Sequence, residues 1–193
     1  MPALNRRHVL TTALAGGTLL LGVRPGTAQT RNVMETMAAD GRFNRFIELI
    51  GRAGATDQLR ATAGVTVFAP VDAAFDVVNA RMTDLLQQGS GGSINQTSSD
   101  PLRLRELIAY HIVAGSMPSS GLTGDRRFKT VNGAELRIAN EGGKIAVSNP
   151  APGQQTGSFG AGGLNVQAPA LVVGPDIIAN NGIIHAISQV LFP

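Results

Sequence analysis

Residues 32–53 place apolar side chains at helical intervals, with charged residues between them. The positions spaced three and four residues apart are Phe43, Phe46, Ile47 and Ile50. This spacing puts them on one face and predicts a helical region that packs on a core through that face. Gly41 is predicted to divide the region into two short helices and Gly54 to end the second, because glycine adopts the left-handed cap conformation without strain.

The next apolar positions alternate with polar ones, which is the spacing of a strand. Residues 65–68 predict a short buried strand that Pro70 ends. Asp72 then stands at the N-cap position of a further helix, before an apolar turn that includes Phe75. Residues 79–88 are predicted to continue that helix.

A further helix is predicted to begin at Pro101, directly after Asp100, where proline suits the first helical position. Its apolar face comprises Leu104, Leu107, Ile108 and His111. His111 therefore lies at the inward edge where the helix ends, and residues 112–115 continue as extended chain.

From residue 128 onward the pattern is that of β-structure. Short strands are predicted at 128–131, 134–140, 144–149, 164–178 and 182–192, the second and third of them joined by a hairpin turn at residues 141–143. Two stretches rich in Gly, Ser, Gln or Pro, 89–100 and 150–163, are predicted to be flexible surface loops.

Composition limits the possible classes of function. The 193 residues suit one domain plus a tail. Aromatic residues make up 4% and Trp is absent, which argues against a base-stacking nucleic-acid surface. The chain has no cysteine, so it forms no disulfide, holds no cysteine metal site and carries no thiol nucleophile.

The first 28 residues have the pattern of an export signal. Arg6 and Arg7 form a basic region, an apolar stretch covers residues 9–23, and small residues up to Ala28 form a cleavage site. The paired arginines also match the twin-arginine pattern, which we favour over general secretion. The alternative is a membrane anchor, but as a helix the stretch would span roughly 22 Å of a roughly 30 Å hydrocarbon core.

Net charge supports the same division into residues 1–28 and a single domain at 29–193. The whole chain has 16 basic and 13 acidic residues. Removal of Arg6, Arg7 and Arg24 with the signal leaves 13 basic against 13 acidic residues. A formally neutral domain gives no electrostatic reason to bind nucleic acid or an anionic membrane.

Only His111 and His185 remain as histidines after signal removal, and both lie in apolar runs. Two histidines without a third ligand at metal-site spacing are a weak zinc signal. Neither the nucleophile elbow of hydrolases nor a phosphate-binding loop is present. We favour an interior role in which one ring nitrogen donates and the other accepts a hydrogen bond. A metal ligand and a general base stay open as alternatives.

Three stretches, in this order, resemble the motifs of the fasciclin (FAS1) domain family. They are residues 66–75 with Asp72 and Phe75, residues 108–115 with Tyr110 and His111, and residues 181–193 with Asn181, Gly182 and His185. The resemblance covers about residues 32–193, although the loops at 89–100 and 150–163 are longer than the family pattern. The Asp-Ile adhesion stretch of animal members finds only a partial match in residues 175–178.

The resemblance implies an α+β fold, a β-wedge of two small sheets with several short helices packed alongside. It also implies that His111 and His185 belong to the packed interior, with Tyr110 beside the former. At Asp72 it implies helix capping and a buried hydrogen bond. Integrin binding is not implied, because the Asp-Ile match is partial and the dipeptide is common.

The resulting functional expectation is an exported, non-enzymatic and cofactor-free module of the bacterial envelope. It would be periplasmic, secreted or on the cell surface, monomeric, without a membrane anchor after cleavage, and would contact a protein or polysaccharide. One alternative is a periplasmic carrier of an apolar small molecule such as a carotenoid, with residues 169–174 lining its groove. An exported hydrolase that uses His111 is the third and weakest hypothesis.

Overall fold

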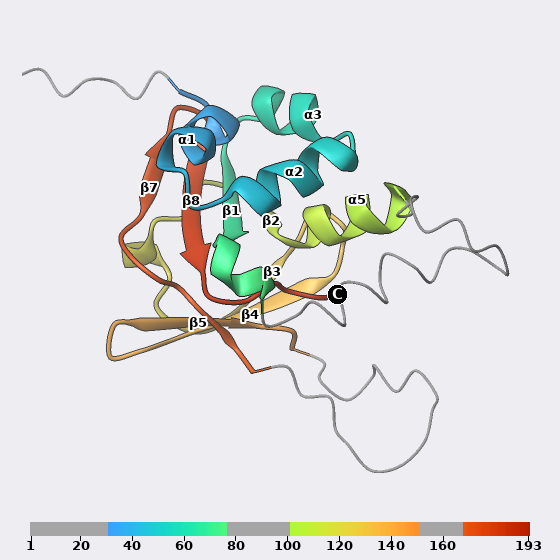
Figure 1. The fold of residues 1–193 in the computed structure, drawn as a ribbon. Helices are drawn as coiled ribbons and strands as arrows, with labels where there is room; N and C mark the ends of the chain where they lie inside the picture. The colour runs from blue at the N-terminus through green and yellow to red at the C-terminus, as the bar shows by residue number, and fades with distance from the viewer. Residues whose placement is uncertain (1–30, 77–100, 151–167) are drawn as a thin grey trace, which may run out of the picture.

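The computed structural model describes residues 31–76, 101–150 and 168–193 as a layer of short helices packed on two small β-sheets (Figure 1). This is the α+β architecture that the sequence predicts, and the prediction of two small sheets with short helices alongside is confirmed. The helices are α1 (Val33–Asp40), α2 (Asn44–Arg52), α3 (Thr56–Ala61) and α5 (Pro101–Tyr110), with 3-10 turns η1 (Asp72–Phe75) and η2 (Ser119–Gly121).

The first two helices form as their sequence predicts. Asn32 and Glu35 make a reciprocal capping box at the start of α1, which satisfies two backbone N–H groups that a helix start leaves open. Gly41 ends α1 with φ 78°, a left-handed conformation that favours glycine. Gly54, just beyond α2, has φ 66°. Pro101 is the first residue of α5.

Sheet A is built around two strands that are buried along their whole length. Its order is β2-β1-β8-β7, with β1 at Val65–Pro70, β2 at Ile112–Ala114, β7 at Ile177–Ala179 and β8 at Gly182–Ile187. All six residues of β1 and all six of β8 are buried. The two pair in parallel while both outer pairs are antiparallel, so segments distant in sequence occupy the centre.

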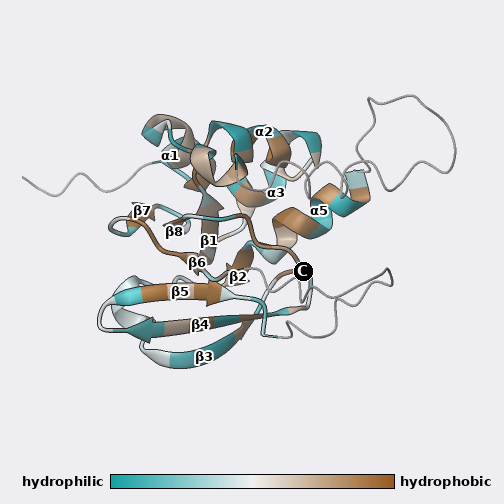
Figure 2. Ribbon diagram, turned by 60° about the horizontal axis from the view of Figure 1, so that its bottom comes forward, coloured by the Kyte–Doolittle hydropathy of each residue, from teal (hydrophilic) through white to brown (hydrophobic). Residues whose placement is uncertain are grey.

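Sheet B lies on the opposite side of sheet A from the helices (Figure 2). Its order is β3-β4-β5-β6, with β3 at Gly124–Lys129, β4 at Glu135–Glu141, β5 at Lys144–Ser148 and β6 at Ala170–Leu171. A hairpin turn forms within the predicted residues 141–143, and it consists of Gly142 and Gly143, both with positive φ. Isolated bridges from Val113 to Thr130 and from Val172 to Ile187 join the two sheets.

Alternation along β1 and β8 divides the interior into two apolar clusters. Val67 and Ile184 face a cluster that includes the helices, whereas Phe68 and Ile187 face a cluster shared with sheet B. Successive strand residues point to opposite faces, so a strand buried on both faces reads as continuously apolar. A polar residue in β8 is therefore enclosed whichever way it points.

Some boundaries differ from the sequence predictions. The first strand of sheet B begins at Gly124 rather than at residue 128. The segment predicted as one strand, 164–178, contains in its described part, 168–178, two short strands, β6 and β7, in different sheets. The last strand ends at Ile187 rather than at residue 192, and α3 was not expected. The helix predicted at 79–88 and the loop at 89–100 lie outside the described residues, as does nearly all of the loop at 150–163.

Candidate functional site

The three motif stretches meet along β1. Phe68 is the register partner of His185, and Val67 is that of both Ile112 and Ile184. The backbone N–H of Phe68 also donates to the carbonyl of His111 at 2.9 Å. The structure thus places one histidine on each side of β1, and each side chain is 0% exposed.

His111 has a partner for each ring nitrogen. Nδ1 lies 2.8 Å from the carbonyl oxygen of Leu107, to which it donates, and Nε2 accepts from the backbone N–H of Leu191 at 3.1 Å. A donor and an acceptor together define a neutral imidazole. Burial lowers the pKa of His111 to about 4, against a weaker opposing effect of the Leu107 hydrogen bond. The ring of Phe46 lies 5.3 Å away, centroid to centroid.

His185 has different surroundings. Nε2 lies 2.8 Å from the carbonyl oxygen of Met117, and because a carbonyl only accepts, Nε2 carries a hydrogen. Nδ1 faces Oδ1 of Asp176 at 3.3 Å, and neither atom has another hydrogen-bond partner. An unprotonated Nδ1 beside an ionised carboxylate would bring two acceptors together, so one proton belongs to this pair, on one atom or the other.

Thr66 and Asp176 hold the segment that supplies the carbonyl partner of His185. Thr66 Oγ1 donates to the carbonyl of Gly115 at 2.6 Å and accepts from the N–H of Met117 at 2.9 Å. The second oxygen of Asp176, Oδ2, accepts from the N–H of Ser119 at 2.7 Å. The Asp-Ile match predicted at residues 175–178 therefore contributes an aspartate that is engaged internally and whose side chain is only 18% exposed.

Tyr110 connects the helical layer to sheet B. The side chain is 1% exposed, and its hydroxyl donates to the carbonyl of Glu135 at 3.1 Å. Burial raises the pKa of Tyr110 to about 12, because the phenolate would lose its water on entering an apolar cluster. The phenol is a neutral hydrogen-bond donor at ordinary pH.

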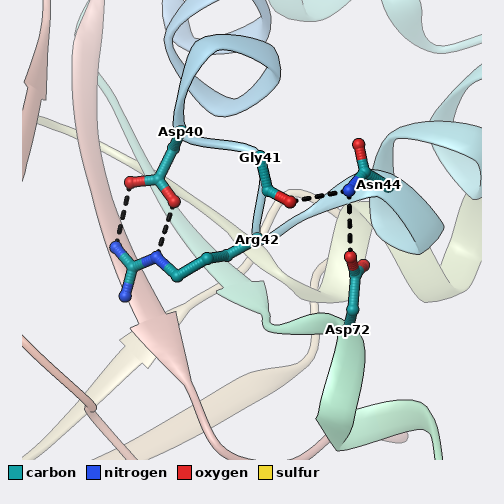
Figure 3. Close-up of polar contacts among 5 residues, drawn as sticks. All are labelled: Asp40, Gly41, Arg42, Asn44 and Asp72. Atoms are coloured by element: carbon teal, nitrogen blue, oxygen red, sulfur yellow. Dashed lines mark hydrogen bonds and ion pairs between the residues drawn. The ribbon is translucent and has the colours of Figure 1, made fainter.

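Asp72 differs from its predicted role. No side chain caps η1, which begins at Asp72. Its carboxylate instead accepts from the Asn44 amide at 3.1 Å (Figure 3). It also accepts from the backbone N–H of Arg45 at 2.8 Å, so it caps the start of α2. The hydrogen bonds are exposed rather than buried, and Asp72 is half-buried. Sequence reasoning found the capping residue but not the helix that it caps.

A second polar contact in this connection fixes the turn between α1 and α2. Arg42 makes a two-pronged contact with Asp40, with Nε at 2.6 Å from Oδ1 and Nη2 at 2.9 Å from Oδ2 (Figure 3). The hydrogen bond from Arg42 lowers the pKa of Asp40 below its ordinary value. Phe75, also in the first motif, is 6% exposed and packs in the helical cluster.

Asn181 and Gly182 close sheet A at the turn before β8. The Asn181 side chain accepts from the N–H of Val33 at 2.8 Å and donates to the carbonyls of Leu59 and Thr62 at 2.9 and 2.8 Å. One amide thus ties α1 and the end of α3 to the sheet. Gly182 lies against the backbone of Val65, where a Cβ atom would clash with the carbonyl oxygen.

The motif residues are thereby structural in their contacts, and within residues 31–76, 101–150 and 168–193 no cluster of His, Asp and Glu suits a metal ion. In the same part of the chain no helix is long and apolar enough to cross a membrane. Arg6, Arg7 and Ala28 of the predicted signal lie outside the described residues. Residues 169–174, expected to line a pigment groove, include β6 and the exposed side chains of Leu171 and Val173.

Sequence reasoning missed two contributors. From the sequence, Asp176 is part of a partial adhesion match, although an acidic residue placed one strand before a buried histidine is a usable signal for pairing. Thr66 was treated only as the polar member of an alternating strand, and its 0% exposure identifies it as an interior hydrogen-bonding residue.

Comparison with known proteins gives a consistent result. The family model of the fasciclin domain matches residues 41–193. Transforming growth factor-beta-induced protein ig-h3 of Sus scrofa is 27% identical over 92% of this chain, which spans 21% of that protein's length. The uncharacterized protein sll1735 of Synechocystis is 29% identical over 83% of this chain and 96% of its own length.

A solved structure has the same fold. A FAS1 domain pair from the insect cell adhesion molecule fasciclin I aligns with a TM-score of 0.53 and 19% identity, over 79% of this chain and 46% of that one. At this identity the likeness concerns the fold alone. The chain thus corresponds to about a fifth of one relative and nearly all of another.

Proposed function

Because this chain belongs to the fasciclin domain family, we propose that it is an exported, non-enzymatic module that contacts a partner protein at the bacterial envelope through its surface. The family includes adhesion-type proteins, and the insect relative is named as a cell adhesion molecule. The sequence of residues 1–28 supports export.

One observation carries the proposal: the motif side chains are occupied inside the protein. Both histidines are 0% exposed and their ring nitrogens face carbonyl, N–H or carboxylate groups of the chain itself. A catalytic base must reach the proton that it abstracts, and neither ring is open to a substrate. Contacts with a partner therefore fall to other residues, on the surface.

The segment that leads from sheet B to sheet A, here called the apolar strip, is the surface that best fits a protein partner. Leu171, Val173 and Ile178 are 46%, 36% and 60% exposed, and all three lie within the short segment from β6 to β7. Figure 2 colours much of this segment as hydrophobic. Exposed apolar side chains within one short segment favour protein–protein contact, because their burial against a partner removes them from water.

Site-specific crosslinking tests this proposal. The chain has no cysteine, so Ile178→Cys gives a single attachment point for a photo-crosslinker in the strip. Val131→Cys is the matched control, since Val131 is 50% exposed but lies in the turn after β3. We expect one discrete envelope protein to be crosslinked from position 178 and not from position 131. Equal crosslinking from both positions, or none from position 178, would contradict the proposal.

A further inference from the structure

An apolar pocket opens on the surface between α3, α5 and the edge of sheet A, remote from the strip at 171–178. Its volume is about 80 Å³. The apolar lining includes Leu59, Val65, Ile108 and Ile112. These residues belong to α3, β1, α5 and β2 in turn, so the pocket walls are parts of the packed fold.

A positive charge stands at this pocket. Arg105 is among its lining residues and is exposed. Its Nε and Nη2 donate to the carbonyl of Ala53 at 3.4 and 3.3 Å, both at the long end of hydrogen-bond geometry. Within the described residues no ion pair neutralises Arg105, so the guanidinium keeps donor capacity and its full charge.

The remaining polar groups at the pocket carry no charge. Gln58 and Thr62 lie on the α3 side, and the Thr62 hydroxyl already donates to the carbonyl of Gln58 at 2.7 Å. Apolar walls with one cation beside them match a ligand that has an aliphatic end and an anionic end. A guanidinium recognises a carboxylate through paired N–H donors.

We propose that this pocket binds a small aliphatic carboxylate, with the hydrocarbon between α3 and α5 and the carboxylate on Arg105. A cavity of about 150 Å³ accepts benzene. A pocket of about 80 Å³ therefore holds part of an aliphatic chain and leaves the polar end at the surface. This inference does not depend on the proposed protein contact, because the two surfaces share no residue.

Hexanoate and 1-hexanol are the probes that separate the two halves of the proposal. Both are unbranched six-carbon molecules, and only hexanoate has a charge. Titration of each into the full chain, followed by two-dimensional NMR, should shift the methyl signals of Leu59, Ile108 and Ile112 saturably. In Arg105→Gln we expect hexanoate to bind about five-fold more weakly, while 1-hexanol binding stays unchanged.

Two further variants complete the design. Arg126→Gln is the matched control, because it removes an exposed arginine on β3 and should leave both affinities unchanged. Ala109→Leu adds bulk to a lining residue and should remove binding of both probes. Should that variant unfold, nuclear Overhauser contacts between the hexanoate methyl group and Ile112 replace it. Absence of saturable shifts, an unchanged hexanoate affinity in Arg105→Gln, or shifts that map elsewhere would overturn the proposal.

Discussion

His111 and His185 are equally buried but differ in their partners. His111 lies between the backbone carbonyl of Leu107 and the backbone N–H of Leu191, so the neutral ring has a hydrogen-bond partner for each nitrogen. His185 lies between the carbonyl of Met117 and the carboxylate of Asp176. A hydrogen bond between Nδ1 and the carboxyl group therefore requires one proton shared by His185 and Asp176. Equal burial therefore does not give the two histidines the same hydrogen-bonding requirement; the kind of atom that faces each ring nitrogen sets it.

The difference also separates two kinds of cross-connection. The His111 ring ties the end of α5 to the segment after β8 through backbone groups. The His185 ring joins β8 to the loops before η2 and β7, and through Asp176 it depends on a side chain. Substitutions near His185 can therefore change one partner at a time, whereas at His111 only the ring itself can be changed.

The largest expected effect is that of His111→Ala. The substitution leaves a cavity beside Phe46 and removes the partner of the buried Leu191 N–H. We expect the free energy of unfolding to fall by about 4 kcal/mol. Urea denaturation measures it, with Arg126→Ala as an exposed control that should change stability by less than about 0.5 kcal/mol. A loss below about 1 kcal/mol would show that the His111 contacts are not structural.

Acid should act on His111 before it reaches most carboxylates. In the unfolded chain the pKa of His111 is near 6.5. In the folded chain the pKa is about 4, because burial disfavours the imidazolium. The pKa is lowered on folding, so this contribution is complete above about pH 6.5 and is lost as pH falls toward about 4. The full loss is about 3 kcal/mol. Ring NMR should show His111 as the neutral Nδ1–H tautomer at pH 5.5; a titration midpoint near 6.5 would contradict this.

A pair of substitutions at Asp176 tests the shared proton. In Asp176→Asn the amide can donate to Nδ1 of a neutral His185 while its oxygen still accepts from Ser119, so we expect a stability change below about 0.5 kcal/mol. In Asp176→Ala both contacts are lost, and we expect a loss of about 2 kcal/mol. Denaturation of both variants under one condition gives the answer. Asparagine as damaging as alanine would show that the ionised carboxylate itself is required.

A loss smaller than that of Asp176→Ala is expected from Tyr110→Phe, next to His111. It removes one hydrogen bond to the Glu135 carbonyl and leaves the ring packing unchanged, so we expect a loss of about 1 kcal/mol. The ring signals of His111 should stay where they are, because the tyrosine contacts sheet B and not the histidine nitrogens. A shifted His111 tautomer would mean that the two neighbours form one unit.

Local sequence signals predicted the elements well. Gly41 and Gly54 gave helix ends, Pro101 gave a helix start and the paired glycines after Glu141 gave a hairpin. Each signal acts within a few residues, because backbone conformation and capping are local effects. The short helix α3 escaped prediction since it has only one buried residue, Leu59, and no side-chain cap.

For long-range contacts, the sequence predicted the role of a residue but not its partner. That Asp72 would cap a helix follows from its residue type, but the helix that it caps, α2, is set by how the chain packs. Likewise, an interior role for His185 follows from its apolar neighbours, whereas its pairing with Asp176 depends on the path of the loop before β7. The chemistry of a side chain is encoded locally, and its partner is not.

The parallel pairing of β1 with β8 constrains how this protein acquires its structure. The centre of sheet A requires a strand from the first motif and one from the last, and a pairing between such distant segments closes a large loop before any contact offsets the lost entropy. During synthesis, the edge of β1 that pairs with β8 must therefore stay open until residues 182–187 have emerged. We expect a chaperone to shield that strand meanwhile, and nascent chains halted before Gly182 to be readily digested by protease.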